Sequence, residues 1–359
     1  MNDAAAMALA LAEATKGIGR THPNPTVGAV LVKGGAVIGR GFTSPPGGPH
    51  AEINALREAG AKAKGATLYC TLEPCDHFGR TGPCSVAIIE AGVKRVVFAI
   101  NDPNPAVNGK GERRLRKAGL AVTKGVLREG AEAMNRPFLN WVRTGLPWVT
   151  LKAGITLDGK LATATGRSKW ITSEASRAMA HRLRNVVDAI VVGRGTVEAD
   201  DPQLTTRIRG GRNALRVVID PRLQSNPRRA IFDVREAPTL VLTEASPDSK
   251  GARALVKRGV EIASLEGLSR DLRPALKLLA ARGAIHVLVE GGAETHRRFL
   301  SQDLADELVL FVAPKLFGHE GLTWSGVLGV KDPGAALQFG PLEATALGGD
   351  VMLRCSRVR

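Results

Sequence analysis

The sequence predicts an α/β protein built from two domains. At 359 residues the chain is long enough to bury two hydrophobic cores. Short apolar runs such as "RVVFAI" (95–100) alternate with helical segments in both halves, a pattern typical of sheets covered by helices on both faces. We find no internal repeat, so the halves are expected to be different domains. The stretch "WVRTGLP" (141–147) marks their boundary and gives domains of residues 1–146 and 147–359.

The first domain is expected to begin with an amphipathic helix over 3–14. Next, "VGAVLVKGGAVIGRG" (27–41) predicts a β-hairpin, because two apolar runs flank the pair Gly34-Gly35. The runs "ATLYCTL" (66–72) and "RVVFAI" predict buried strands. The other predicted helices cover residues 50–59, 84–91, 112–118 and 129–139.

The second domain is predicted to continue in the same α/β style. Its strand candidates are "WVTLKAGITLDG", "DAIVVG", "LRVVID", "TLVLT", "IHVLVE" and "ELVLFVAP", and helical runs include 173–184 and 274–281. The glycine fingerprint G-x-G-x-x-G is missing from this half, so the sequence gives no support to a standard dinucleotide-binding fold.

The net charge of +16 is spread evenly along the chain. Residues 1–146 hold 19 Lys and Arg against 11 Asp and Glu, a net of +8, and the remainder contributes the other +8. Aromatic residues make up 4% of the chain, with one tyrosine, which is poor material for stacking nucleic-acid bases. We therefore expect a solvated basic surface and arginines that hold an anionic small molecule, with no nucleic-acid partner.

The sequence predicts a cytoplasmic protein that does not enter a membrane. No apolar run approaches the roughly 20 residues of a spanning helix. The Ala- and Leu-rich start lacks a basic leading region and contains Asp3 and Glu13, which favours a helix over a signal peptide. Four cysteines are too few for a disulfide scaffold at this length.

Two cysteines and an upstream histidine form a candidate zinc site. In "TLEPCDHFGRTGPC" (71–84), Cys75 follows a buried strand and Cys84 opens the next predicted helix, while His50 of "HAE" opens an earlier one. A catalytic zinc site uses three nitrogen and sulfur ligands and leaves one position for water. Helix N-termini favour anionic thiolate and hydroxide. Glu52 lies two residues after His50, where it can carry protons to and from the water.

This order of residues, H-x-E followed by P-C and a second cysteine, is the pattern of zinc-dependent deaminases. In that chemistry the metal lowers the pKa of water to roughly 7, and a glutamate moves the protons. The usual spacing has two residues between the cysteines, whereas this sequence has eight. The alternative is a closed structural zinc site with Asp76 or His77 as fourth ligand, which leaves Glu52 without a role.

The loop between the cysteines and a proline-flanked asparagine supply candidate contacts for the deaminase substrate. His77 and Arg80 lie within the loop, next to the expected metal. Asn24, in "THPNPTVGAV" (21–30), stands between two prolines before a buried strand, where a side-chain amide can orient a heterocycle. The alternative for Asn24 is an ordinary turn residue.

The longer motifs resemble the bifunctional deaminase–reductase family of riboflavin biosynthesis. The resemblance is carried in the first half by "THPNPTVGAV", "HAE", "TLEPCDHFGRTGPC" and "INDPNPAVNGKG". In the second half it is carried by "LKAGITLDGKLAT", "SKWITSEASR", "GTVEADDPQLTTR", "VLVEGGAETHRRFL" and "VAPKLFG". It spans essentially the whole chain and is weakest over 230–273. The family often has a second cysteine where this sequence has Asp76, which argues against a metal role for that position.

The resemblance implies a cytidine-deaminase-like three-layer α/β/α domain followed by a dihydrofolate-reductase-like domain. The first would bind one Zn2+ through His50, Cys75 and Cys84 and deaminate 2,5-diamino-6-(ribosylamino)-4(3H)-pyrimidinone 5'-phosphate with Glu52 as proton shuttle. The second would use NADPH to reduce the ribosyl group to ribityl, giving 5-amino-6-(5-phosphoribitylamino)uracil. A homodimer or homotetramer is also implied.

The resemblance also assigns residues in the second domain. Its cofactor positions are Gly154, Trp170, Thr196, Asp200, Gly291, Gly292, Ala293, Glu294 and Thr295. Its substrate positions are Ser168, Arg184, Leu204, Arg207 and Glu290. Physically, a glycine pair before a helix N-terminus suits a pyrophosphate, and arginines suit a 5'-phosphate. Without the resemblance, the glycine pair fits an ordinary strand-to-helix turn equally, and the two arginines fit a solvated surface. Thr196 and Asp200 are one helical turn apart and are expected on one face. Lys152 and Asp158 are candidate proton donors.

Two other functions fit parts of the sequence. A base deaminase acting on nucleic acid such as tRNA, with an appended binding domain, would share the metal motif, although the diffuse charge and few aromatic residues count against it. A scaffold protein with a purely structural metal predicts that Glu52 can be replaced without consequence.

Overall fold

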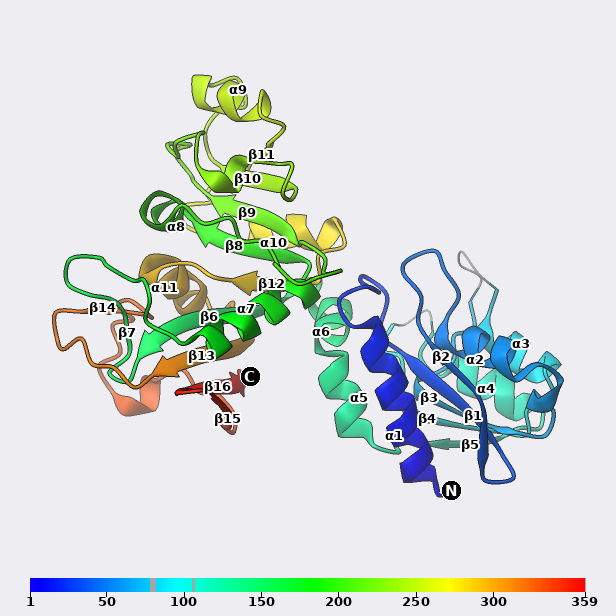
Figure 1. Cartoon of the computed structure of the whole chain (residues 1–359). Helices are drawn as coiled ribbons and strands as arrows, with labels where there is room; N and C mark the ends of the chain where they lie inside the picture. Colours follow the sequence, from blue (N-terminus) through cyan, green and yellow to red (C-terminus); the bar gives the residue numbers. More distant parts are fainter. Residues whose placement is uncertain (78–81, 105–106, 359) are drawn as a thin grey trace. The chain divides into compact units, whose positions relative to one another are not determined.

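The chain folds into two compact units, Met1–Gly145 and Leu146–Arg359 (Figure 1). The computed structural model describes residues 1–77, 82–104 and 107–358. Each unit has its own sheet and its own core, and the division falls within the stretch in which the sequence places the boundary.

The first unit contains a five-stranded sheet in the order β2-β1-β3-β4-β5. The predicted hairpin forms its antiparallel edge, and β3, β4 and β5 run parallel to one another. Both residues of the turn, Gly34 and Gly35, have positive φ angles (57° and 79°), which glycine adopts without strain. The strands are β1 (Gly28–Lys33), β2 (Ala36–Phe42), β3 (Thr67–Leu72), β4 (Arg95–Ile100) and β5 (Ala121–Lys124).

Helices cover both faces of this sheet, as Figure 1 shows, with α1, α5 and α6 on one side and α2, α3 and α4 on the other. The predicted three-layer arrangement is therefore confirmed. The helices are α1 (Asp3–Ala14), α2 (Ala51–Ala59), α3 (Cys84–Glu90), α4 (Lys110–Lys117), α5 (Arg128–Met134) and α6 (Arg136–Thr144), with short 3-10 turns η1 (Thr15–Gly17) and η2 (Gly60–Ala63).

The single helix predicted over 129–139 is wrong, because the chain breaks at Asn135 into α5 and α6. The Asn135 side chain is buried and pairs with the backbone of Thr26: its Oδ1 accepts from the Thr26 N–H (2.8 Å) and its Nδ2 donates to the Thr26 carbonyl (3.0 Å). Asparagine side chains that bond to backbone in this way compete with helical geometry. The break fixes the start of α6 next to the segment that enters β1.

The second unit contains a nine-stranded sheet in the order β11-β10-β9-β8-β12-β6-β13-β16-β15. Its strands are parallel from β11 to β13, and β16 and β15 close one edge in antiparallel pairing. The strands are β6 (Trp148–Thr156), β8 (Ala189–Gly193), β9 (Leu215–Ile219), β10 (Thr239–Thr243), β11 (Glu261–Ser264), β12 (His286–Val289), β13 (Glu307–Ala313), β15 (Glu343–Leu347) and β16 (Asp350–Ser356). A separate pair joins β7 (Lys160–Ala162) to β14 (Leu322–Thr323).

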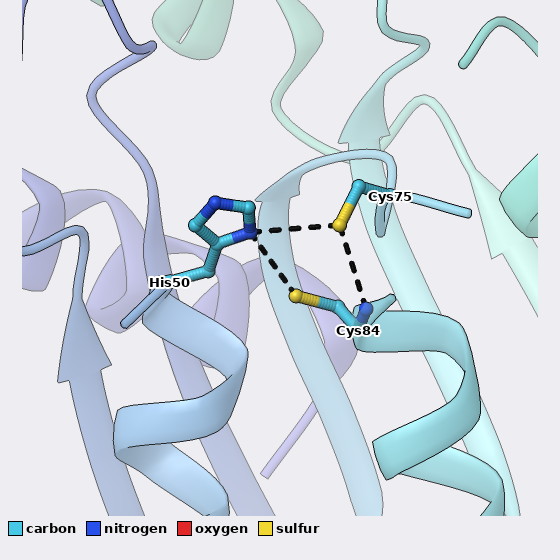
Figure 2. A group of neighbouring side chains, drawn as sticks. All are labelled: His50, Cys75 and Cys84. Carbon is cyan, nitrogen blue, oxygen red and sulfur yellow. Dashed lines mark hydrogen bonds between the residues drawn. The ribbon is translucent and has the colours of Figure 1, made fainter. Parts of the chain in front are cut away.

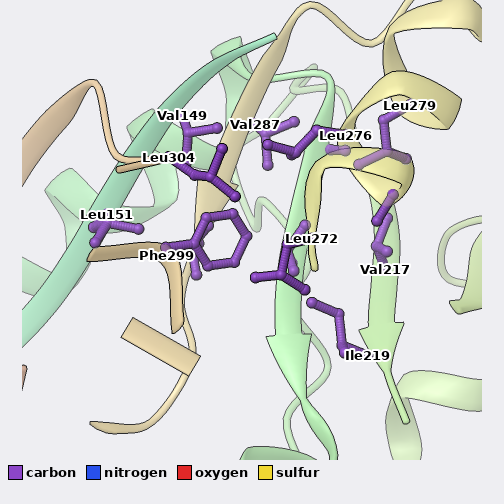
Figure 3. Packing of buried hydrophobic residues seen from close by; sticks show 14 of the residues in the cluster. Val149, Leu151, Val217, Ile219, Leu272, Leu276, Leu279, Val287, Phe299 and Leu304 are labelled. Carbon is purple, nitrogen blue, oxygen red and sulfur yellow. The ribbon is translucent and has the colours of Figure 1, made fainter. Parts of the chain in front are cut away.

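Two hydrophobic cores sandwich the parallel strands, because successive strand residues point to opposite faces. On β9, Val217 and Ile219 join one core and Val218 the other. Figure 3 shows the first core, in which Phe299 and the leucines of α10 pack on β6, β9 and β12. The helices are α7 (Glu174–Val186), α8 (Arg194–Asp200), α9 (Lys250–Val256), α10 (Arg273–Ala281) and α11 (Ala293–Ser301), with 3-10 turns η3 (Ala230–Phe232) and η4 (Pro333–Ala335).

Among the helices of the described ranges, none combines the length and the apolar character that crossing a membrane requires.

Candidate metal centre and reductase cleft

His50, Cys75 and Cys84 come together from three elements of the first unit (Figure 2). His50 is the N-cap residue of α2, Cys75 follows the exit of β3, and Cys84 is the first residue of α3. The His50 Nδ1 lies 3.3 Å from the Cys84 Sγ and 3.5 Å from the Cys75 Sγ. All three ligand atoms lie within 4.8 Å of one another. Two sulfurs and one imidazole nitrogen at this separation suit a tetrahedral zinc ion with a fourth position left open.

The expected fourth-ligand alternatives do not join this group. Among the described residues, only these three form a cluster of His, Cys, Asp or Glu close enough to share a metal. The Asp76 carboxylate instead accepts a hydrogen bond from the Ser85 hydroxyl and pairs with the Arg114 guanidinium. The side chain of Asp76 is thus held away from the centre, which keeps an open coordination position.

One thiolate ligand is already favoured without a metal, and a bound cation would displace the protons from His50 and Cys84. Hydrogen bonding to Cys84 lowers the pKa of the Cys75 thiol to about 4 against the opposing effect of burial, and the Cys84 backbone N–H donates to the Cys75 Sγ (3.4 Å). The contact with Cys75 raises the pKa of His50 to about 9. A thiolate beside backbone N–H groups at a helix start is the ligand state that zinc requires.

Glu52 lies in the first turn of α2 and is 4% exposed. Burial, reinforced by the negative charge of Cys75, raises the pKa of Glu52 to about 7. A carboxyl group with a pKa near neutrality can both accept and release a proton during one catalytic cycle.

A cavity of about 240 Å3 opens beside the metal centre. Of the residues predicted for it, His50, Glu52, Cys75, Asn24 and His77 line its wall. Arg80, the remaining predicted substrate contact, lies outside the described residues.

Other residues of this wall carry no role in the sequence-based prediction, among them Glu73, two polar residues after β4 and two aromatic residues. Asp102 and Asn104 follow β4, and Phe138 and Trp141 come from α6. Burial raises the pKa of Asp102 to about 6. The motif "INDPNP" could have drawn attention to Asp102 and Asn104, because polar residues directly after a parallel strand meet at the ligand-binding edge of the sheet. No sequence signal singles out the two aromatic residues.

The second unit holds a larger cleft of about 720 Å3 at the carboxyl ends of its parallel strands. Eleven of the predicted positions line it: Gly154, Ser168, Trp170, Arg184, Thr196, Asp200, Leu204, Arg207, Glu290, Gly291 and Gly292. Thr196 and Asp200 both face it from α8, as their spacing predicts. Of the unpredicted lining residues, His181 projects from α7, and its Nδ1 lies 3.1 Å from the Thr205 carbonyl oxygen.

The remaining predicted cofactor positions, Ala293, Glu294 and Thr295, lie on the first turn of α11, directly after the lining residues Gly291 and Gly292. A Cβ at Gly291 would lie 2.4 Å from the Cβ of Thr295, so only glycine lets the strand exit approach this helix start so closely. The Glu294 side chain pairs with Arg297 on the exposed side of the helix (2.6 Å). Ala293 and Glu294 can therefore contribute backbone N–H groups, which suit a pyrophosphate.

Glu290 is the charged centre of the cleft. Its carboxylate accepts from the Nε of Arg184 (2.6 Å) and from the Nζ of Lys152 (3.4 Å). Burial alone would raise the pKa of Glu290, but the charges of Arg184 and Lys152 outweigh it and hold the pKa at about 2. The carboxylate is therefore ionised at any physiological pH.

The two candidate proton donors, Lys152 and Asp158, differ in their position relative to the cleft. Lys152 lines the cleft. Asp158 does not: its carboxylate accepts from the Thr156 hydroxyl and from the backbone N–H groups of Phe317 and Gly318 (3.2 and 2.8 Å). The prediction for Asp158 is corrected, because the side chain fastens the turn after β6 to a distant loop.

Comparison with known proteins accounts for both units. A family model described as the cytidine and deoxycytidylate deaminase zinc-binding region matches residues 1–100, and one described as the RibD C-terminal domain matches residues 147–353. The Riboflavin biosynthesis protein RibD of Aquifex aeolicus is 46% identical over 348 residues, covering 97% of this chain and 96% of that protein. The chain belongs to the RibD family.

Solved RibD structures agree with this assignment over the full length. Acinetobacter baumannii RibD superposes with a TM-score of 0.90 at 37% identity, covering 99% of both chains. A TM-score of 0.89 at 38% identity, again covering 99% of both chains, is found for a Thermotoga maritima protein. That protein is named diaminohydroxyphosphoribosylaminopyrimidine deaminase/5-amino-6-(5-phosphoribosylamino)uracil reductase. RibD of Escherichia coli K12 is 39% identical over 379 residues, 98% of this chain and 99% of that protein.

Membership of the RibD family confirms the main functional prediction. The chain is a bifunctional deaminase and reductase of riboflavin biosynthesis, with a cytidine-deaminase-like domain and a dihydrofolate-reductase-like domain, and its cofactors are zinc and NADPH. The His–Cys–Cys centre fits the zinc, and the glycine-lined cleft fits the nucleotide. These findings favour the RibD function over the tRNA base deaminase, because the second half matches a RibD domain rather than an appended nucleic-acid-binding domain.

Proposed function

We propose that this RibD chain acts on the two compounds named for its Thermotoga maritima relative. The first is 2,5-diamino-6-(ribosylamino)-4(3H)-pyrimidinone 5'-phosphate, which residues 1–146 deaminate. The second is the resulting aminouracil, whose ribosyl group residues 147–359 reduce to ribityl, giving 5-amino-6-(5-phosphoribitylamino)uracil. The observation that carries the proposal is the buried Glu52 next to an open His–Cys–Cys centre on the wall of one cavity.

In the deaminase, His50, Cys75 and Cys84 would hold the zinc, whose Lewis acidity makes water a stronger nucleophile at neutral pH. Water adds to the ring carbon that bears the amino group, the carbon–nitrogen bond breaks, and ammonia leaves. Glu52 takes a proton from the water and delivers protons to the ring nitrogen and the leaving amine. Asn24 and His77 orient the heterocycle from the wall, and we retain Arg80 as a contact for the substrate.

In the reductase, NADPH supplies the hydride for the anomeric carbon of the ribosyl group, and a proton is added to the ring oxygen as the sugar ring opens. Thr196, Asp200, Gly154, Trp170 and the backbone of 291–295 hold the nucleotide. The substrate contacts we propose are Ser168, Arg184, Leu204, Arg207 and Glu290. Lys152 is placed to supply the proton, because it lines the cleft and lies next to the ionised Glu290.

We further propose a cytoplasmic homodimer or homotetramer. The cytoplasm fits because Cys75 and Cys84 must stay reduced to ligate zinc, and cytoplasmic thiols are kept reduced. Size-exclusion chromatography with light scattering measures the oligomer, and a monomer at micromolar concentration would refute that part.

A coupled assay tests the function. The diaminopyrimidine phosphate and NADPH are supplied together, and ammonia release and NADPH oxidation are followed separately. Both signals are expected, with oxidation lagging behind ammonia. Ammonia without oxidation would refute the reductase assignment, and oxidation without prior ammonia would refute the proposed order.

A further inference from the structure

We propose that Glu73 is a positioning residue of the deaminase pocket, where its carboxylate fixes the segment that brings Asp102 and Asn104 to the substrate. The inference rests on the deaminase function proposed above and adds a determinant of substrate affinity within the same site.

Glu73 directly follows β3, is 2% exposed and is itself one of the residues that line the cavity. Its Oε2 accepts hydrogen bonds from the side-chain Nδ2 of Asn101 (2.8 Å) and the backbone N–H of Gly109 (3.0 Å). Its Oε1 accepts from the backbone N–H of Glu112 (3.2 Å). A single buried carboxylate thus has three donors, all from the chain that follows β4.

These donors lie at the two ends of the connection from β4 to α4. Asn101 is the first residue after β4, whereas Gly109 and Glu112 belong to the start of α4. Gly109, the N-cap residue of α4, has no side chain to cap the helix, and the Glu73 carboxylate takes that place from outside. Asp102 and Asn104, which line the cavity, lie between the two fixed ends.

The start of α4 also lies directly against the residue between Glu73 and Cys75. A Cβ at Gly111 would lie 1.9 Å from the carbonyl oxygen of Pro74, so this approach needs glycine. The strand exit that presents Cys75 to the metal is therefore packed against the helix whose cap holds the Asp102 segment. This contact links the position of the metal ligand to the position of the substrate-binding wall.

The chemistry of the contact requires a carboxylate. All three partners are donors, and a carboxylate offers only acceptors. An amide at this position keeps one accepting oxygen and turns an NH2 group toward donors, which leaves at least one buried N–H without a partner. Glu73→Gln therefore preserves size while releasing one end of the segment.

The test uses the full-length enzyme and the diaminopyrimidine phosphate. We expect Glu73→Gln to raise KM for ammonia release by about tenfold or more, with a smaller change in kcat, because binding contacts are displaced and Glu52 is not. Zinc content should stay at one per chain, and the reductase KM should not change. Asn101→Ala removes one donor from outside the pyrimidine cavity and should raise KM by about two- to fivefold.

Glu112→Gln is the matched control. Its backbone N–H belongs to the same first turn of α4, but its side chain pairs, among the described residues, with the exposed side chains of Arg116 and Lys124, so KM should stay within about twofold. A double-mutant cycle with Asp102→Asn distinguishes a positioning role of Glu73 from a purely structural one. If Glu73 acts through this segment, its replacement adds little in the Asp102→Asn background.

Two results would overturn the inference: an unchanged KM in both Glu73→Gln and Asn101→Ala, or fully additive effects in the cycle. If Glu73→Gln does not fold, Asn101→Ala decides the matter, because it leaves the carboxylate and both backbone contacts intact. A wild-type enzyme that releases no ammonia would instead refute the proposed deaminase function.

Discussion

Arg184 and Glu290 form a two-pronged ion pair inside the reductase cleft, in which Nε and Nη2 of the arginine donate to the two carboxylate oxygens at 2.6 and 3.0 Å. The third guanidinium nitrogen, Nη1, donates to the Thr205 carbonyl (3.1 Å). Arg184 therefore orients both Glu290 and the segment that carries Leu204 and Arg207. The guanidinium of Arg184 is held in one orientation, because three of its nitrogens already donate hydrogen bonds.

The ion pair predicts an acid-sensitive contribution to stability. Because the pKa of Glu290 in the folded chain is about 2, below its ordinary value of 4.5, the contribution is present above pH 4.5 and is lost as the pH falls toward 2. Glu290→Gln should destabilise the protein at pH 7 by on the order of 3 kcal/mol. The difference in the free energy of unfolding between the variant and the wild type, measured by urea unfolding, should become smaller below pH 4.5. The exposed pair of Glu261 with Arg282 supplies the control, and a gap that stays constant down to pH 3 would contradict the prediction.

Glu52→Gln should lower kcat for deamination by about 10²- to 10⁴-fold, because the amide cannot carry the proton. Zinc content and NADPH oxidation with the deaminated substrate should remain at wild-type levels. Glu58→Gln, on the exposed side of the same helix, is the matched control. Normal ammonia release by Glu52→Gln would favour a purely structural metal.

Arg207→Ala should weaken binding of the phosphorylated substrate far more than binding of NADPH. The Arg207 guanidinium lines the cleft, and the partner that we find for it is the uncharged side chain of Gln203 (2.7 Å), which leaves its charge for a phosphate. The substrate KM should rise by about tenfold or more, while the NADPH Kd, from fluorescence titration, changes by less than about twofold. Arg209→Ala, two residues away and outside the cleft lining, controls for the loss of charge. Equal losses in both affinities would count against the assignment.

Trp141→Ala should raise KM for deamination, because the indole forms part of the cavity wall and next to Phe138 offers an aromatic face to the pyrimidine. Stacking on an aromatic ring is worth about 0.5–1.5 kcal/mol, so KM is expected to rise by about two- to tenfold. Trp141→Phe keeps an aromatic ring and should raise KM by less. Val142→Ala tests a neighbour on α6 that does not line the cavity. A KM that responds equally to both alanine variants would indicate a general effect on the helix.

The metal centre could be predicted from the sequence because its residues occur at element ends that local patterns reveal. His50 opens a helix after a Pro/Gly loop, Cys75 follows an apolar run, and Cys84 starts another helix. The β-hairpin and the alternation of strands and helices are likewise local properties. The resemblance supplied what local patterns lack, namely that residues as distant as Gly154 and Glu290 share one cleft.

The errors have a common physical cause, which is side-chain pairing over long sequence distances. The helix break at Asn135 depends on Thr26, 109 residues away, and the orientation of Asp158 depends on Phe317 and Gly318. Nothing near Asn135 or Asp158 in the sequence announces these partners. Tertiary contacts also decide that one face of α6, with Phe138 and Trp141, meets the pocket rather than the core alone.

The break at Asn135 also bears on which segment of the chain holds the whole deaminase cavity. The zinc-binding match ends at residue 100, and by then all three metal ligands have been supplied. The cavity wall also includes Asp102, Asn104 and two residues of α6, and the start of α6 is tied to Thr26. A fragment of residues 1–100 would contain the three metal ligands but lack part of the cavity wall, which is complete only in the unit that ends at Gly145.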